Sequence, residues 1–171
     1  MKYKVGSRVI YPAHGTAKIV GRTTRTFDGE EVAYLELVVP ERGFGTSGDM
    51  TVLVPEAKAA ELGVRDAISA DEADEVLEVL AVSNVRMPTN WSRRFKNHQE
   101  KLKSGDVYEC AEVVRNLTRR EQSGSLSTAE KSMQARARHI LISELSVSWG
   151  VGPEAAESRI DQVLADSAPV T

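Results

Sequence analysis

The hydrophobic pattern of this 171-residue chain changes its period once, at Pro55. Before Pro55 the apolar and β-branched residues form short continuous or alternating runs, which are typical of strands. After it, apolar residues recur every three or four positions, as they do on helices that cover a core. This single change predicts an α+β protein with a β domain at residues 1–55 and a helical domain at residues 65–171.

Turn signals divide the first part into short strands. Asp28-Gly29 favours a tight hairpin, because both residues tolerate positive φ angles. The glycine-rich segment 40–49 is expected to form a long loop. So many short strands in so few residues predict a small, strongly bent Tudor-like or SH3-like barrel, with an unclosed meander as the alternative. The main runs are residues 9–11, 17–20, 32–39 and 50–54.

Capping signals divide the second part into helices. Ser69 with Glu72, and Ser127 with Glu130, have the spacing of a capping box, in which each residue satisfies a backbone N–H of the other. Pro153 is typical of a first helical residue. The expected helices cover residues 55–62, 70–82, 90–104, 107–122 and 128–149, and a last one begins at residue 153.

The composition and the placing of reactive residues argue against a membrane protein or an enzyme. Hydrophobic residues make up 41% and charged residues 27%, as in soluble globular proteins, and no apolar run reaches the roughly 18 residues of a membrane span. Cys110 is the single cysteine, so a disulfide framework is excluded. The histidines His14, His98 and His139 lack metal-ligand spacing. We expect a monomeric, cytoplasmic protein without catalytic residues, cofactor, metal or small-molecule substrate.

The segment 88–96 combines a helix start with unusual charges. Pro88 disfavours helical geometry in the residue before it, and Thr89 or Asn90 can cap, so Trp91 falls in the first turn. Three cations follow at the positive end of the helix dipole, where each opposes the macrodipole by roughly 0.3–1 kcal/mol. Cations in this place indicate an external anion, and the neighbouring indole favours nucleic acid. The three cations are Arg93, Arg94 and Lys96.

Helical spacing leaves the location of Trp91 open. Its side chain falls on the apolar stripe of Phe95, His98 and Leu102, which favours a place in the core. A residue in the first turn can also project beyond the packed stripe, which favours a place on the surface. The pattern alone does not choose between them.

The basic residues gather in the middle of the chain. The net charge of −3 conceals two opposite blocks, because residues 54–83 carry two Lys/Arg against eight Asp/Glu, whereas residues 84–140 carry twelve against six. The basic block predicts a phosphate-binding surface over two or three helices. No helix-turn-helix spacing accompanies it, which favours contact with the DNA backbone over base reading. Its further members are Lys101, Lys103, Arg115, Arg119, Arg120, Lys131, Arg136 and Arg138.

Two separated motifs in this order point to a known family. They are Lys-Val-Gly-Ser-Arg-Val-Ile-Tyr-Pro-Ala-His-Gly at residues 4–15 and Pro-Thr-Asn-Trp-Ser-Arg-Arg at residues 88–94, with further matches at residues 126–131 and 137–141. Together they resemble the CarD/CdnL family of bacterial transcription regulators, over nearly the whole chain.

The resemblance implies a DNA contact for the helical domain. In this family that domain touches promoter DNA at the upstream edge of the transcription bubble. A tryptophan that matches Trp91 wedges into the minor groove there and helps to keep the bubble open. Lys131 matches a basic position on the DNA-facing side, and Arg138 shares its helix face. The expected DNA contacts are Trp91, Arg93, Arg94, Lys96, Lys131 and Arg138.

The resemblance also implies that the Tudor-like domain binds the β subunit of RNA polymerase through an exposed strand edge. Arg25 matches a polymerase-contacting arginine. Leu53 stands where some actinobacterial members have an arginine, and the loop 40–49 is longer than the family pattern. Either departure would change the polymerase affinity or redirect the module to another partner. The expected polymerase contacts are Arg25, Thr26, Thr51 and Leu53.

These expectations describe a transcription regulator that binds polymerase and stabilises the open promoter complex. Two alternatives use the same residues differently. In one, the protein is a stand-alone architectural DNA-binding protein whose β module has another partner. In the other, it is an interaction adaptor with Trp91 in the core and no role at DNA.

Overall fold

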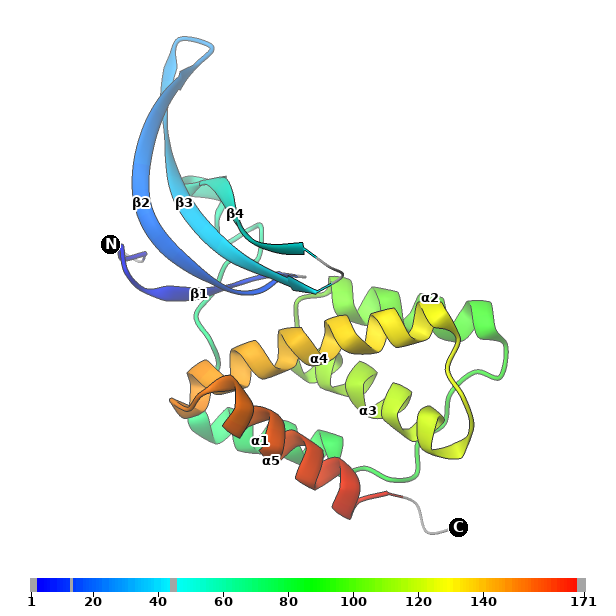
Figure 1. Cartoon of the computed structure of the whole chain (residues 1–171). Helices are drawn as coiled ribbons and strands as arrows, with labels where there is room; N and C mark the ends of the chain where they lie inside the picture. The colour runs from blue at the N-terminus through cyan, green and yellow to red at the C-terminus, as the bar shows by residue number, and fades with distance from the viewer. Residues whose placement is uncertain (1–2, 13, 44–45, 169–171) are drawn as a thin grey trace. The chain divides into compact units, whose positions relative to one another are not determined.

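The fold is given by a computed structural model, which describes residues 3–12, 14–43 and 46–168. The chain divides into two compact units, Met1–Ala67 and Ile68–Thr171. Among the described residues, the first unit contains a curled antiparallel sheet and the second contains five α-helices (Figure 1). The expected α+β class, with a β unit before a helical unit, is confirmed.

Four strands lie side by side in the order of the sequence, and each is antiparallel to the next. Pairing between the first and last strands is not found in the described residues, so the sheet is a half-barrel rather than a closed barrel. A bulge between Ile19 and Gly21 shifts the register of the second strand, and bulges bend a strand and increase its twist. The strands are β1 (Arg8–Tyr11), β2 (Gly15–Phe27), β3 (Glu30–Gly43) and β4 (Thr46–Pro55).

The β2–β3 turn forms as the sequence predicts. Phe27 pairs with Glu30, and the two residues between them, Asp28 and Gly29, have φ angles of 51° and 79°. Two positive φ angles in succession match the twist of the flanking strands. The hairpin prediction is therefore confirmed.

The prediction of a long loop at residues 40–49 is wrong. The β3–β4 pairing continues from Val39↔Met50 through Pro40↔Asp49 to Gly43↔Thr46, so most of this segment extends a hairpin. Pro40 is tolerated there because β2 pairs with β3 only as far as Val38, which leaves that side of β3 without a ladder that needs its N–H. The two residues between the strands, 44 and 45, lie outside the described residues.

The segment after Pro55 belongs to the β unit. In place of the expected helix at residues 55–62 there is one 3-10 turn, η1 (Glu56–Lys58). Arg65 exchanges backbone hydrogen bonds with Ile10 of β1 at 2.7 and 3.2 Å. The core of this unit contains Tyr3, Val9, Ala17, Ile19, Leu35, Leu37, Val39, Val54, Ala59 and Val64.

The helical unit packs around α3, which contacts α1, α2 and α4. None of the helices within the described residues is long and apolar enough to cross a membrane. The predicted helices after residue 68 are confirmed apart from small shifts at their ends. They are α1 (Ala70–Leu80), α2 (Trp91–Lys103), α3 (Val107–Ser123), α4 (Thr128–Trp149) and α5 (Pro153–Asp166).

One buried arginine ties the ends of two of these helices together. Arg119 of α3 is 5% exposed, and its guanidinium donates hydrogen bonds to the carbonyl oxygens of Leu80 at 3.1 Å, Val82 at 3.4 Å and Leu164 at 2.9 Å. These carbonyls lie at the C-terminal ends of α1 and α5, where intrahelical partners run out. Arg119, which the sequence placed on a phosphate-binding surface, is a structural residue.

Candidate nucleic-acid interface

Trp91 is the first residue of α2 and lies at the surface. The side chain of Asn90 caps this helix by accepting the N–H of Arg93 at 3.0 Å. The Trp91 side chain is 43% exposed, and its ring stacks on Phe95 at 5.0 Å with an interplanar angle of 10°. The rest of the stripe packs inward, with His98 only 2% exposed. The first turn thus projects beyond the packed stripe.

The indole of Trp91 is held by a second helix. Its Nε1–H donates a hydrogen bond to Ser127 Oγ at 3.1 Å. Ser127 is the N-cap of α4 and accepts the N–H of Glu130 at 3.2 Å, in the predicted capping box. A local cap, readable from the sequence, therefore also contacts a residue 36 positions away.

Arg94 departs from the expected DNA contact. Its side chain is 2% exposed, and its Nε donates to Glu130 Oε2 at 3.0 Å. A buried charge is tolerated only when it is paired and hydrogen-bonded, and this pairing occupies the guanidinium. Burial alone raises the pKa of Glu130, but hydrogen bonds from Arg94 and Ser127 outweigh it and lower the pKa. The burial of Arg94 argues against a role in binding phosphate.

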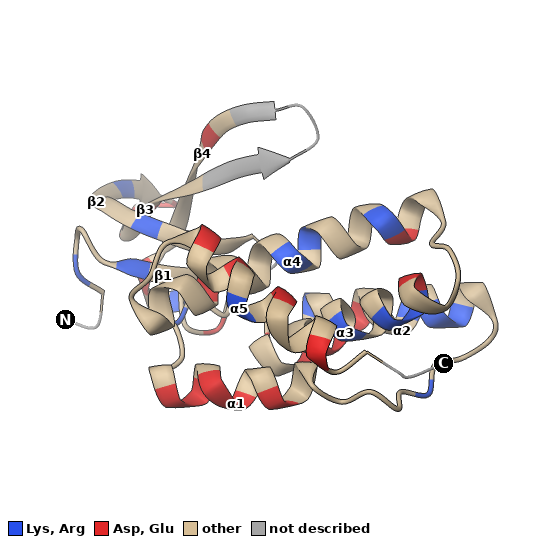
Figure 2. Ribbon diagram, turned by 60° about the horizontal axis from the view of Figure 1, so that its bottom comes forward, with Lys and Arg blue, Asp and Glu red and all other residues tan. Residues whose placement is uncertain are grey.

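Other expected cations remain at the surface. Arg93 and Lys96 are exposed on the first turns of α2, and Lys131 is exposed in the first turn of α4, directly after Glu130. Figure 2 shows basic residues on α2, α3 and α4, whereas acidic residues predominate along α1. These three cations and the indole belong to the two helix starts that the Trp91–Ser127 bond joins.

Arg138 lies farther along α4 and has partners on α5. Its guanidinium is 2.8 Å from Asp161 and 3.2 Å from Glu157. Burial lowers the pKa of Arg138, but the two carboxylates outweigh this effect and raise the pKa. Its charge is balanced within the protein, which weakens its predicted part in DNA binding.

Two further arginines of the basic block lie close to backbone or carboxylate groups. Arg115 donates to the carbonyl oxygen of Val79 at 3.1 Å, and burial lowers its pKa. Arg120 lies near Glu130, with a distance of 3.8 Å between Nε and Oε2. Both arginines are half-buried, and the sequence did not separate them from the exposed cations, because both kinds occur on the same helices.

The expected polymerase contacts lie on two strands of the β unit. Thr51 and Leu53 are on β4, one of the two outer strands of the sheet, where they alternate with Val52 and the buried Val54. Arg25 and Thr26 are exposed on β2 and pair with Val32 and Glu31 near the β2–β3 turn. The two pairs of residues are therefore separated by β3.

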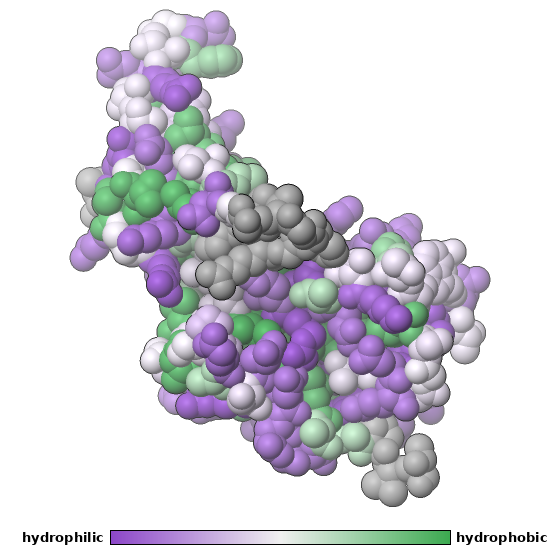
Figure 3. Space-filling view, in the orientation of Figure 1, coloured by the Kyte–Doolittle hydropathy of each residue, from purple (hydrophilic) through white to green (hydrophobic). Residues whose placement is uncertain are grey.

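An exposed aromatic residue at the β2–β3 turn was missed by the sequence analysis. Phe27 is 69% exposed, and an apolar group is visible at the outer end of this hairpin (Figure 3). Phe27 is next to Thr26 and two residues from Arg25. The signal was available, since an aromatic residue beside Asp28-Gly29 in a two-residue turn has little core to reach.

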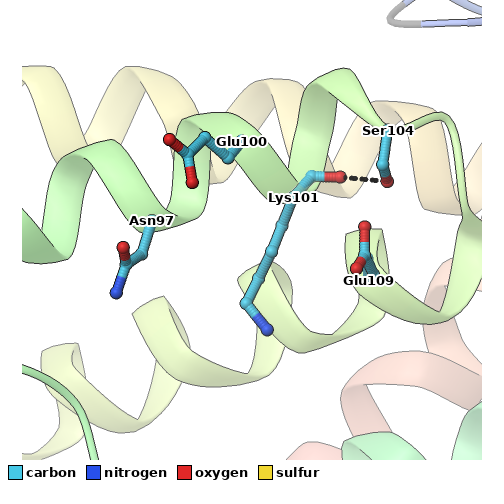
Figure 4. A pocket seen from close by; sticks show the side chains of 5 residues that line it. All are labelled: Asn97, Glu100, Lys101, Ser104 and Glu109. Carbon is cyan, nitrogen blue, oxygen red and sulfur yellow. Dashed lines mark hydrogen bonds between the residues drawn. The ribbon is translucent and has the colours of Figure 1, made fainter.

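The helical unit also contains a surface pocket and a buried cysteine, and neither has the features of a reactive site. An open polar pocket of about 440 Å³ is lined by Asn97, Glu100, Lys101, Ser104 and Glu109 (Figure 4). Burial raises the pKa of the Cys110 thiol to about 12, which keeps it protonated and weakly nucleophilic. Within the described residues, no group of three or more His, Cys, Asp or Glu residues has the arrangement of a metal site.

Comparison with known proteins agrees with the two units. Residues 3–68 match the model of the CarD-like/TRCF RID domain, and residues 75–161 match that of the CarD C-terminal domain. The chain is also 28% identical over 149 residues to a protein of Bacillus subtilis (strain 168) named "Putative transcription factor YdeB", covering 87% of this chain and 94% of that protein. With both domain models matched in order, the chain belongs to the CarD family of transcription regulators.

Proposed function

We propose that this regulator binds the β subunit of RNA polymerase and stabilises the open promoter complex, with Trp91 as a wedge in the minor groove at the upstream edge of the bubble. The observation that carries the proposal is the indole of Trp91, 43% exposed and fixed at a helix start beside the exposed Arg93 and Lys96. Apolar wedges flanked by cations are a common means of binding a distorted minor groove.

The cations fall into two groups, those exposed to solvent and those paired with carboxylates of the protein. Arg93, Lys96 and Lys131 are exposed and contact phosphates, which positions the protein without reading sequence. Arg94 is left out of the DNA contact because Glu130 holds its guanidinium in the interior. Arg138 contributes little, because Glu157 and Asp161 already balance its charge.

The β unit supplies the polymerase contact. The outer side of β4 is a sheet edge within the described residues, and a strand of the β subunit pairs with it by β-augmentation. Thr51 and the half-buried Leu53 make this part of the edge uncharged. Arg25 and Thr26 form a second contact near the β2–β3 turn.

The two contacts depend on each other. Unstacking a base step costs a few kcal/mol, so the wedge acts only where the bubble edge is already distorted. Binding to free duplex DNA is therefore weak, and the polymerase contact supplies the effective concentration. The protein acts as a monomer on promoter DNA in the cytoplasm, largely without sequence preference.

The lifetime of the open complex tests the proposal. Trp91→Ala is expected to shorten the lifetime at least on the order of ten-fold, because the stacking of an aromatic side chain on a base is worth about 1–3 kcal/mol. Binding to the isolated β subunit is expected to stay unchanged. Trp149→Ala is the matched control. This second indole is the last residue of α4, away from the start of that helix at Ser127, and donates to Asp74.

Two outcomes would contradict the proposal. An unchanged lifetime with intact polymerase binding would remove the wedge. Tight and steeply salt-dependent binding to duplex DNA without polymerase would favour the stand-alone architectural protein instead.

A further inference from the structure

The hydroxyl of Ser127 makes all three hydrogen bonds that a serine side chain can make. A serine hydroxyl has one donor and two acceptor positions. Ser127 Oγ accepts the N–H of Glu130 at 3.2 Å and the indole N–H of Trp91 at 3.1 Å, and it donates to Glu130 Oε1 at 3.2 Å. The cap of α4 fixes the direction of this hydroxyl, and the hydroxyl in turn fixes the indole.

Glu130, the other half of the same capping box, fixes the chain that leads into α2. It binds the guanidinium of Arg94 through both carboxylate oxygens, at 3.0 and 3.5 Å. The Nη1 of Arg94 also donates to the carbonyl oxygens of Pro88 and Thr89, each at 3.3 Å. The two residues before the N-cap are thereby tied to a side chain that α4 holds in the interior.

Phe95 supplies a third restraint. It lies one turn after Trp91 on α2 and packs against the helical core, and its ring stacks on the indole at 5.0 Å. The indole is therefore restrained at its ring by Phe95, at its N–H by Ser127 and through its backbone by the Arg94–Glu130 pair. A side chain that is restrained before binding loses less conformational entropy when it binds.

We infer that Ser127 and Glu130 are positioning residues for Trp91, so that the capping box of α4 also holds the indole in its exposed place. The consequence of this at the promoter rests on the proposed function, in which the indole is the wedge. Neither residue touches DNA in this role; each acts through the start of α2.

The test separates positioning from helix capping. Ser127→Gly removes the hydroxyl, and glycine at an N-cap costs only a few tenths of a kcal/mol relative to serine. Ser69→Gly is the matched control, because the Ser69–Glu72 box of α1 has the same internal bonds. Ser127→Thr restores a hydroxyl at the cap. All variants carry Trp149→Phe, which leaves Trp91 as the only indole of the chain.

The first readout is the fluorescence of Trp91 in the free protein. Ser127→Gly is expected to lower its anisotropy and increase its quenching by acrylamide, whereas Ser69→Gly leaves both unchanged and Ser127→Thr restores them. Equal anisotropy in Ser127→Gly and the parent would overturn the inference. So would an equal loss of anisotropy in Ser69→Gly, since that would reflect general loosening.

The second readout is the open-complex lifetime with polymerase. Ser127→Gly is expected to shorten it on the order of two- to ten-fold, the range that corresponds to one hydrogen bond. If Ser127→Gly frees the indole but neither it nor Trp91→Ala changes the lifetime, the positioning stands and the proposed function fails. If Trp91→Ala shortens the lifetime and Ser127→Gly leaves the indole fixed, the function stands and the positioning fails.

Discussion

The two serine capping boxes of this chain have nearly the same internal hydrogen bonds but different contacts with the rest of the helical unit. In α1, Ser69 accepts the N–H of Glu72 at 3.1 Å; in α4, Ser127 accepts the N–H of Glu130 at 3.2 Å. Both serine N–H groups donate to the glutamate at 3.4 Å. Glu72 is exposed, whereas Glu130 is 1% exposed. Only the α4 box is joined to α2 within the described residues, through Trp91 and Arg94.

A local capping motif can therefore have a tertiary role that its spacing in the sequence does not show. The α1 box satisfies backbone groups at a solvent-exposed helix start, which is worth about 1 kcal/mol. The α4 box satisfies the same groups and also neutralises a buried arginine. The two boxes should therefore respond very differently to the same substitution.

The largest expected effect is that of Glu130→Ala. It leaves the guanidinium of Arg94 buried without a counter-charge, and breaking a buried pair in this way costs about 3–5 kcal/mol of unfolding free energy. Glu72→Ala, the matched change in α1, is expected to cost about 1 kcal/mol or less. Urea denaturation of both variants measures the difference, and equal losses would show that the Arg94–Glu130 pair contributes nothing beyond capping.

His98 extends the comparison to pH, because it lies on α2 four residues after Arg94. Burial, followed by the charge of Lys101, lowers the pKa of His98 to about 4 from 6.5, although Glu130 opposes the shift. Between these values the unfolded chain binds a proton that the folded chain does not. The contribution of neutral His98 to the free energy of unfolding is therefore fully present above pH 6.5 and is lost as the pH falls toward 4.

The expected loss from His98 is about 3 kcal/mol across that window. Urea denaturation at several pH values measures it. His98→Gln, which keeps a polar group near Asn116 but cannot titrate, should flatten the profile between pH 4 and 6.5. A profile with the same slope in this variant would assign the pH dependence to other groups. Below pH 4.5, protonation of Glu130 acts in the same direction, since its pKa is lowered in the folded state.

The smallest expected effects compare two cations of α4. Arg138→Ala removes two partly exposed ion pairs and is expected to cost about 1 kcal/mol or less of stability. Its effect on DNA contact should be small. Lys131→Ala should leave stability nearly unchanged but reduce the salt dependence of DNA binding in the polymerase complex by about 0.9 in the logarithmic slope. A larger slope change for Arg138→Ala would reverse this assignment.

Features that depend on neighbouring residues were predictable from the sequence. Asp28-Gly29 specifies its turn through the φ angles of two adjacent residues, and Ser69 and Ser127 specify helix starts through partners three residues away. The strands before Pro55 and the helices after residue 68 follow from the period of the apolar pattern, although the helix expected at residues 55–62 does not form. In each case, the physical cause lies within a few residues.

Features that depend on distant partners were not predictable. Arg93 and Arg94 are adjacent and chemically alike, yet one is exposed and the other is buried against a glutamate 36 residues away. Helical spacing places Arg94 on the inward face of α2, four residues before the buried His98, but it does not show the partner that allows a charged side chain to be buried there. The strand pairing through Pro40 was missed for a related reason, because proline is excluded from a strand only where a neighbour needs its N–H.

The guanidinium of Arg119 has a consequence for the time course of synthesis. The sheet unit joins strands that are adjacent in sequence, so all its partners have been made once residue 67 has left the ribosome. The helical unit instead joins its first and last helices, because Arg119 donates to the carbonyl oxygens of Leu80 in α1 and Leu164 in α5. A nascent chain that lacks α5 leaves Arg119 without one of its carbonyl partners, so the second unit becomes fully stable only after α5 has been synthesised.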